Sequence, residues 1–179
     1  AEMLQAAGYR TGMFGKWGLG TEGGTGLPSR QGFDEFFGYL DQSHAHNYYP
    51  TFLIRGNERH QLDNVVPNPG RQGQGVASEK KTYSHDLIMG EALDFIDRNR
   101  DEPFFLYLPE TIPHANNEAG DEGMEVPSLG IYADRDWPEP EKGRAAMISY
   151  LDRDIGRLMQ KLKDLGIDRR TIVFFTSDN

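Results

Sequence analysis

Apolar residues recur at steps of three and four along the segment from about Glu141 to Leu165. Because an α-helix has about 3.6 residues per turn, this spacing places them on a single stripe. The stripe consists of Met147, Leu151, Ile155, Leu158, Leu162 and Leu165. Gly166 follows where a helix C-terminal cap is expected. The same reasoning predicts an amphipathic helix from Tyr83 to about Asn99, and Glu2–Ala7 resembles the end of a helix.

Short apolar segments between these helices predict β-strands. Phe104–Leu108 and Thr171–Thr176 are apolar on both faces, which is typical of buried parallel strands. Tyr9–Trp17 begins like a strand and then runs into glycines. The resulting order, helix and strand in alternation, predicts an α/β fold with a mostly parallel central sheet. Glycine- and proline-rich segments predict the loops, at Gly18–Gly26, Asn64–Ala77 and Pro109–Pro140.

The composition narrows the class of protein. The formal net charge is −9, and an acidic chain repels phosphate backbones, so nucleic acid is not an expected partner. No apolar run approaches the roughly 18 residues that a membrane-spanning helix requires. The chain contains no cysteine, which excludes disulfides, thiol nucleophiles and thiolate metal sites within it.

Polar residues follow all three predicted strands. Lys16 ends the first, His114 lies in the loop after the second, and Asp178 and Asn179 follow the third. Ligands of open parallel sheets bind beyond the carboxyl ends of the strands, so these side chains are expected to converge. Asp178 and Asn179 supply oxygen ligands of the kind that Ca²⁺ or Mg²⁺ prefers.

Each of these residues also has a structural interpretation. Asp-Asn is a common turn or helix-cap pair. A lysine among glycines is more often a solvated surface residue. His114 could transfer a proton near neutral pH, or simply make a local hydrogen bond in its loop.

Two further histidines are close in sequence. His44 and His46 flank one alanine, and residues at this spacing in an extended segment point to the same side. They could bind a metal or hydrogen-bond an oxyanion or a sugar hydroxyl, although zinc requires three or four protein ligands. His60 has no distinguishing neighbours, and His85 is predicted to lie on the surface of its helix.

The segment Gly8–Gly20, GYRTGMFGKWGLG, resembles a signature of the sulfatase family. In that family a Gly-Tyr-x-Thr segment leads into Gly-Lys-Trp-His-Leu-Gly. Gly32–Gly38, Tyr150–Leu158 and Thr171–Asn179 are also similar to sulfatases and occur in the family's order. The resemblance spans nearly the whole chain.

This resemblance implies an alkaline-phosphatase-like α/β/α sandwich and hydrolysis of a sulfate monoester at a Ca²⁺ site. It implies a formylglycine nucleophile, made from a Cys or Ser. By similarity, Lys16 contacts the sulfate, His114 binds it and assists the leaving oxygen, and Asp178 and Asn179 ligate the metal. Ser43, His44 and His46 fall where the family places residues that contact the substrate.

The chain departs from the family pattern at several points. Gly18 stands where many sulfatases have a histidine, and His44 or His46 is a hypothetical replacement. The nucleophile motif, Cys or Ser followed by x-Pro-Ser-Arg, is absent, since Leu27–Arg30 places Gly26 at the nucleophile position. We therefore expect residues 1–179 to be part of one sulfatase catalytic domain, truncated at both ends and inactive alone.

Two alternatives remain open at this stage. One is a phosphodiesterase or phosphonate hydrolase of the same superfamily, and the other is a non-catalytic sulfate-binding pseudoenzyme. The expected partner is a sulfated small molecule or sulfated saccharide. The expected location, from the resemblance, is periplasmic or secreted.

Overall fold

The computed structural model describes residues 1–177. Its α-helices are α1 (Glu2–Ala6), α2 (Ser84–Arg98) and α3 (Glu139–Asp164). Its strands are β1 (Arg10–Lys16), β2 (Glu35–Tyr39), β3 (Phe52–Arg55), β4 (Glu58–Gln61) and β5 (Phe104–Tyr107). Short 3₁₀ turns are η1 (Pro28–Arg30), η2 (His44–His46), η3 (Asn117–Glu122), η4 (Gly130–Tyr132) and η5 (Asp168–Arg170).

The described strands form one sheet in the order β4-β3-β2-β1-β5. β1 lies between β2 and β5 and pairs in parallel with both. β3 pairs antiparallel with β2, and β4 antiparallel with β3. The α/β class and the parallel centre of the sheet are therefore confirmed, whereas the β3–β4 hairpin, which turns at Gly56 with φ of 62°, was not predicted.

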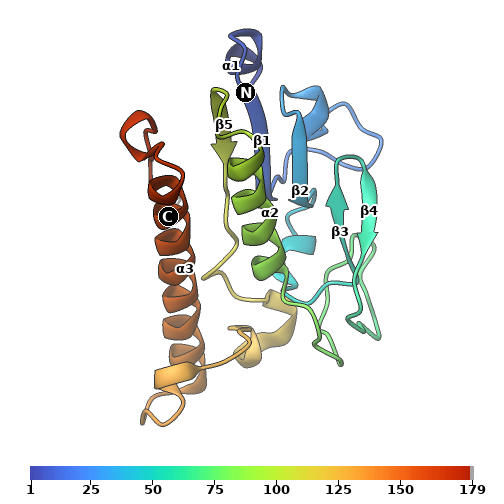
Figure 1. Ribbon diagram of the computed structural model, residues 1–179. Coiled ribbons are helices and arrows are strands. Elements are labelled where there is room, and N and C mark those ends of the chain that lie inside the picture. The colour runs from blue at the N-terminus through green and yellow to red at the C-terminus, as the bar shows by residue number, and fades with distance from the viewer. Residues whose placement is uncertain (178–179) are drawn as a thin grey trace.

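Each face of the sheet has its own apolar layer. α2 covers one face, where Ile88, Ala92 and Phe95 pack against Phe14 and Phe37 (Figure 1). The opposite face is covered by the segment between β1 and β2, whose Leu27 and Phe33 lie in a cluster with strand residues. Alternation along β1 explains this division, because successive strand side chains point to opposite faces.

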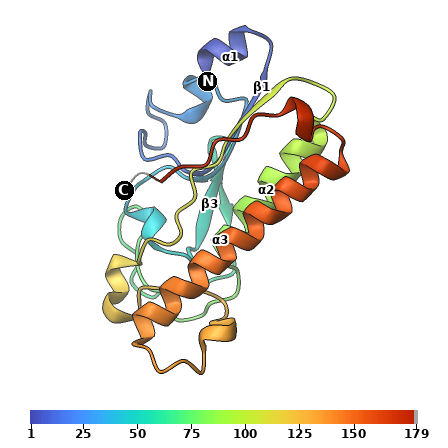
Figure 2. The same ribbon diagram turned by 90° about the vertical axis from the view of Figure 1, so that its left-hand side faces the viewer.

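α3 is the longest helix and runs alongside α2 (Figure 2). The predicted stripe is confirmed, since Met147, Leu158 and Leu162 are buried. The last turns of the stripe pack with Ile96 of α2, and its first turns pack with loop residues such as Tyr83. The helix ends before Gly166, whose φ of 67° is the left-handed conformation of a C-terminal cap.

The predicted strand Thr171–Thr176 is wrong for the described chain. No strand is assigned there, and Phe174 is 90% exposed. β-propensity describes how well a side chain fits a pleated, half-buried surface, and a strand also needs a neighbour for its backbone hydrogen bonds. The described part of the chain supplies this segment with neither.

Candidate active site

The carboxyl ends of β1, β2 and β5 lie at one edge of the sheet because the three strands are parallel. Backbone hydrogen bonds join the segments that leave this edge. The Lys16 N–H donates to the Pro109 carbonyl at 2.9 Å, and the Trp17 N–H donates to the Tyr39 carbonyl at 2.8 Å. The backbone of Lys16 therefore lies beside the start of the loop that carries His114, and the convergence of the two side chains stays a prediction.

A buried tyrosine, Tyr48, donates a hydrogen bond to the backbone of the loop that carries His114. The Tyr48 hydroxyl lies 3.1 Å from the Thr111 carbonyl oxygen and 2.5 Å from the His114 carbonyl oxygen, and its proton is shared between them. Tyr48 is fully buried, and burial raises the pKa of its phenol well above the ordinary value. The hydroxyl therefore stays protonated and remains a donor to the loop.

His114 itself is exposed to solvent. Its Nδ1 lies 2.6 Å from the Ala115 carbonyl oxygen, which can only accept, so Nδ1 carries the proton of this hydrogen bond. That tautomer leaves Nε2 as the acceptor nitrogen of the neutral ring. Among the described residues Nε2 has no hydrogen-bond partner, and it is available to a ligand.

His46 lies directly against His114. The two rings are stacked, with centroids 5.2 Å apart and planes 9° from parallel. His46 Nδ1 lies 3.2 Å from a Glu118 carboxylate oxygen, and its Nε2 lies 3.5 Å from the Asn117 amide nitrogen. The structure thus brings together two of the predicted site residues, from segments nearly 70 positions apart in sequence.

His44 lies in a different environment. It is 2% exposed, and its ring packs between Tyr39 and Phe52, with Gly73 closely above. Burial lowers the pKa of His44 to about 4, so the ring is neutral at physiological pH. His44 therefore differs from His46 and His114 in being buried among aromatic rings, and its contact with a substrate stays a prediction.

Ser43 precedes this turn and is partly exposed. The Asp41 carboxylate accepts from the backbone N–H of Ser43 at 2.8 Å and of His44 at 3.1 Å, which organises the start of η2. Within the described chain the Ser43 hydroxyl has no hydrogen-bond partner. Its predicted role in binding a substrate stays a prediction.

The predicted metal ligands Asp178 and Asn179 lie outside the described residues. Within residues 1–177 no group of three or more His, Asp or Glu side chains could hold a metal ion.

A buried ion network was missed by the sequence reasoning. His85 is 0% exposed, so its predicted place on the surface is wrong. Its Nδ1 lies 2.8 Å from a Glu110 carboxylate oxygen and its Nε2 lies 2.9 Å from an Asp154 oxygen. Asp154 also accepts hydrogen bonds from Arg153 and Arg157. The network joins α2, α3 and the loop after β5.

The two carboxylates determine the charge of His85. Burial alone lowers the pKa of a histidine, but the charge of Glu110 and the hydrogen bonds to Asp154 and Glu110 outweigh it and raise the pKa to about 9. One feature of the sequence could have revealed this network. Asp154 falls on the apolar stripe of α3, between Leu151 and Leu158, where a carboxylate needs buried partners.

Comparison with known protein families gives a match over the whole chain. The model of the sulfatase family matches residues 1–179. This chain belongs to the sulfatase family. It is 32% identical to human arylsulfatase A over 194 residues, which cover 100% of this chain and 34% of the relative. It is 30% identical to N-acetylgalactosamine-6-sulfatase of Mus musculus, covering 99% of this chain and 32% of the relative.

A solved structure has a similar fold. The structure titled Ps i-CgsB in complex with k-i-k-neocarrahexaose matches with a TM-score of 0.68 and 26% sequence identity, covering 93% of this chain and 36% of that one. The sulfatase chain described here thus spans about a third of the length of the curated relatives it matches. None of its described helices is both long and apolar enough to cross a membrane.

Gly18 stands at the position where many sulfatases have a histidine, and the side chain of another residue occupies the space beside it. Gly18 has a φ of 71°, and a Cβ atom built on it would lie 2.3 Å from the Gln42 side-chain nitrogen. The Gln42 side chain therefore occupies the space that a side chain at position 18 would need. That His44 or His46 replaces the missing histidine in function stays a prediction.

Proposed function

We propose that the full-length protein containing this chain hydrolyses sulfate monoesters. Family membership supports the reaction class. The observation that carries the assignment to this edge of the sheet is the hydrogen bond between Lys16 and Pro109, which holds the lysine strand against the loop of His114. The cation of Lys16 and the exposed ring of His114, both following parallel strands at the same edge of the sheet, are suited to bind an anionic ester.

In this proposal each residue has a distinct role. The Lys16 ammonium stabilises the negative charge that develops on the sulfate oxygens. In its protonated form His114 keeps Nδ1–H on the Ala115 carbonyl and donates from Nε2, first to the sulfate and then to the departing alcohol oxygen, which takes the proton. His46 supports His114 through the stacked contact, and Ser43 and His44 contact the substrate as the resemblance implies.

The nucleophile and the metal are taken from the family resemblance. We propose a formylglycine nucleophile outside residues 1–179, and one Ca²⁺ bound in part by Asp178 and Asn179. A bound Ca²⁺ would supply positive charge near the sulfate. The proposed roles of Lys16 and His114 involve only side chains within residues 1–179.

We also propose that the substrate is a sulfated small molecule or a sulfated saccharide. Relatives named for N-acetylgalactosamine 6-sulfate and a structure titled as a neocarrahexaose complex support the saccharide. We further propose that residues 1–179 form part of one catalytic domain and that the protein is periplasmic or secreted. Fractionation of the natural host would test the location.

The reaction class is tested by offering the full-length protein a panel of esters. The panel holds 4-nitrophenyl sulfate, 4-nitrophenyl phosphate, bis(4-nitrophenyl) phosphate and several sulfated monosaccharides. We expect release of sulfate and little release of phosphate. Faster hydrolysis of the phosphodiester would favour the phosphodiesterase alternative, and binding of sulfate without any turnover would favour the pseudoenzyme.

The place of the site is tested with Lys16→Ala. Loss of one group that stabilises developing charge lowers kcat by roughly 10²–10³-fold in other enzymes, and we expect a loss of that order. Lys163→Ala is the matched control, because Lys163 is exposed on α3, far along the chain from the proposed site. Equal activity of the two variants would overturn the role of Lys16.

A further inference from the structure

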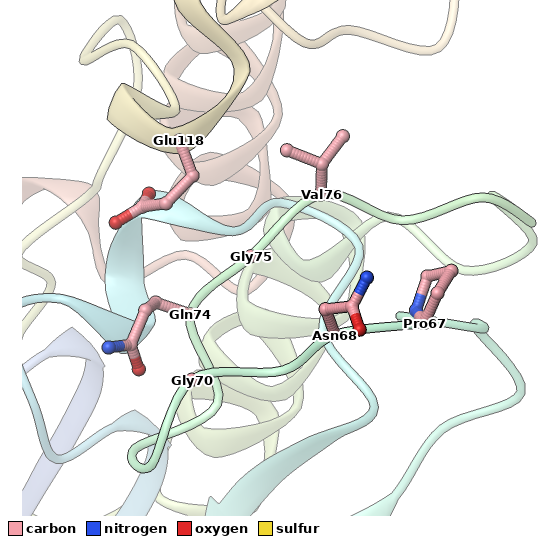
Figure 3. Close-up of a pocket in the computed structure, with 7 residues that line it drawn as sticks. All are labelled: Pro67, Asn68, Gly70, Gln74, Gly75, Val76 and Glu118. Carbon is pink, nitrogen blue, oxygen red and sulfur yellow. The ribbon is translucent and has the colours of Figure 1, made fainter.

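Two loops that are distant in sequence flank a cavity of about 410 Å³ that is open to solvent. One wall is the loop between β4 and α2, and the other is η3, after β5. The cavity is lined by Pro67, Asn68, Gly70, Gln74, Gly75, Val76 and Glu118 (Figure 3). Its volume lies in the range of roughly 300–1,000 Å³ that is usual for small-molecule sites.

Buried asparagines hold the two walls together. The Asn116 amide donates to the Gly75 carbonyl at 3.0 Å, and the Asn116 side-chain oxygen accepts from the Glu118 N–H at 3.2 Å. The Asn47 amide donates to the Gly73 carbonyl at 3.4 Å. Both asparagines are fully buried. The cavity is therefore formed before any ligand arrives, which reduces the entropy lost on binding.

The turn that forms the lower wall is also ordered by its own hydrogen bonds. The Gly70 N–H donates to the Gln74 carbonyl at 2.8 Å, and the Gln74 side-chain oxygen accepts from the Gln72 N–H at 3.1 Å. This arrangement leaves the Gln74 side-chain nitrogen free to donate to a ligand. Figure 3 shows the Gln74 amide and the Glu118 carboxylate on the same side of the cavity.

The lining suits a neutral, hydroxylated ligand. Carboxamides such as those of Asn68 and Gln74 both donate to and accept from hydroxyl groups, and the Glu118 carboxylate accepts from them. Apolar atoms, among them those of Pro67 and Val76, form the larger part of the lining surface, which suits the apolar face of a sugar ring. No lysine or arginine lines the cavity, and Glu118 would repel a sulfate or carboxylate group. A sugar ring without charged substituents fits this combination.

The cavity adjoins the proposed active site through one side chain. Glu118, which lines the cavity, also contacts His46, and His46 stacks on His114. We infer that this cavity is a subsite for a neutral sugar unit next to the sulfated unit of a saccharide substrate. This inference rests on the proposed sulfatase function. We expect the carboxylate of Glu118 to disfavour a uronic acid or a second sulfated unit in the subsite.

The test compares substrates of the full-length protein that differ by one unit. The first is the sulfated monosaccharide that the wild type hydrolyses fastest, and the second is the same sugar extended by one galactose. A third carries a glucuronic acid in place of the galactose. For the wild type we expect the galactose extension to raise kcat/KM and the glucuronic acid extension to give no gain.

The variants then change the side chains that line the cavity. In Asn68→Ala/Gln74→Ala the loss of two neutral hydrogen bonds should cost about tenfold in kcat/KM for the galactose-extended substrate only. Val76→Trp, which fills the cavity, should abolish the gain from the extension. Gln72→Ala is the matched control, because Gln72 is an exposed residue of the same turn whose side chain does not line the cavity.

Equal losses on the monosaccharide and on the extended substrate, or no loss on either, would overturn the subsite. Equal melting temperatures of the variants exclude misfolding as the cause. If the wild type hydrolyses no sulfate ester, the proposed function has failed. Calorimetric binding of the unsulfated disaccharide to the wild type and to Val76→Trp then decides the subsite separately, with weaker binding to the variant expected.

Discussion

The two ends of the short segment from Glu110 to His114 lie in opposite environments. Glu110 contacts His85, which is fully buried, whereas His114 is exposed and stacks on His46. Both regions are built from histidines and carboxylates. They differ in how many of the histidine nitrogens already have an acidic partner.

That difference separates a structural histidine from a reactive one. His85 has a carboxylate on each ring nitrogen, so it is held as a cation and has no nitrogen to offer to a ligand. His114 uses Nδ1 for a carbonyl and leaves Nε2 available. The same short segment is thus anchored at one end and presents a proton donor or acceptor at the other.

The largest effect is expected on turnover by His114→Ala. Removing a general acid or base lowers turnover by roughly 10²–10⁴-fold, and an exposed side chain contributes little to stability. We expect the melting temperature to stay close to that of the wild type. His60→Ala, at an exposed histidine of β4, is the matched control. A fall in melting temperature without a loss of turnover would show that His114 is the structural histidine and not the reactive one.

His85→Ala should do the opposite and act mainly on stability. It leaves Glu110 and Asp154 without their shared partner, and breaking a buried ion pair in this way costs about 3–5 kcal/mol. Urea unfolding of the variant measures the loss. A change of less than about 1 kcal/mol would show that the network contributes little to the fold.

The contribution of His85 should also depend on pH. Its pKa of about 9 in the folded chain lies above the ordinary value, so its stabilising effect is complete below roughly pH 6.5 and is lost as the pH rises through about 9. The difference in unfolding free energy between wild type and His85→Gln should therefore shrink from pH 7 to pH 10. A difference that stays constant would contradict a charged His85.

The smallest effect is expected from Tyr48→Phe, which removes the hydroxyl under the His114 loop. One lost hydrogen bond costs about 1 kcal/mol of stability, and a loosened loop should lower turnover severalfold. Tyr83→Phe is a closely matched control, since its buried hydroxyl donates to the Glu125 carbonyl instead. It should lose similar stability but keep its turnover. Equal turnover of the two variants would show that the Tyr48 hydroxyl does not support the reactive position of His114.

Elements with a strong local pattern were predicted well. The stripe from Met147 to Leu165 and the cap at Gly166 follow from helix geometry alone, and the structure confirms them. The meeting of the Lys16 backbone with the loop after β5 follows from the rule that parallel strands share a carboxyl edge. These predictions succeeded because each depends on residues close together or on a topological rule.

Features that need a distant partner were not predicted. His85 resembles a surface helix residue until α3 and the loop after β5 bring Asp154 and Glu110 to it. Thr171–Thr176 has a strand-like composition, but within the described residues no neighbouring strand pairs with it. Nor does any local pattern indicate that Gln42 fills the space beside Gly18.

The sequence by itself determined the helices, the parallel centre of the sheet and the family, because hydrophobic periodicity and short motifs are local properties of the chain. Only the tertiary structure decided which histidines are available. The charge and reactivity of an imidazole depend on burial and on the groups that face its two nitrogens. In this protein those groups come from segments that are far apart in sequence and meet only in the folded chain.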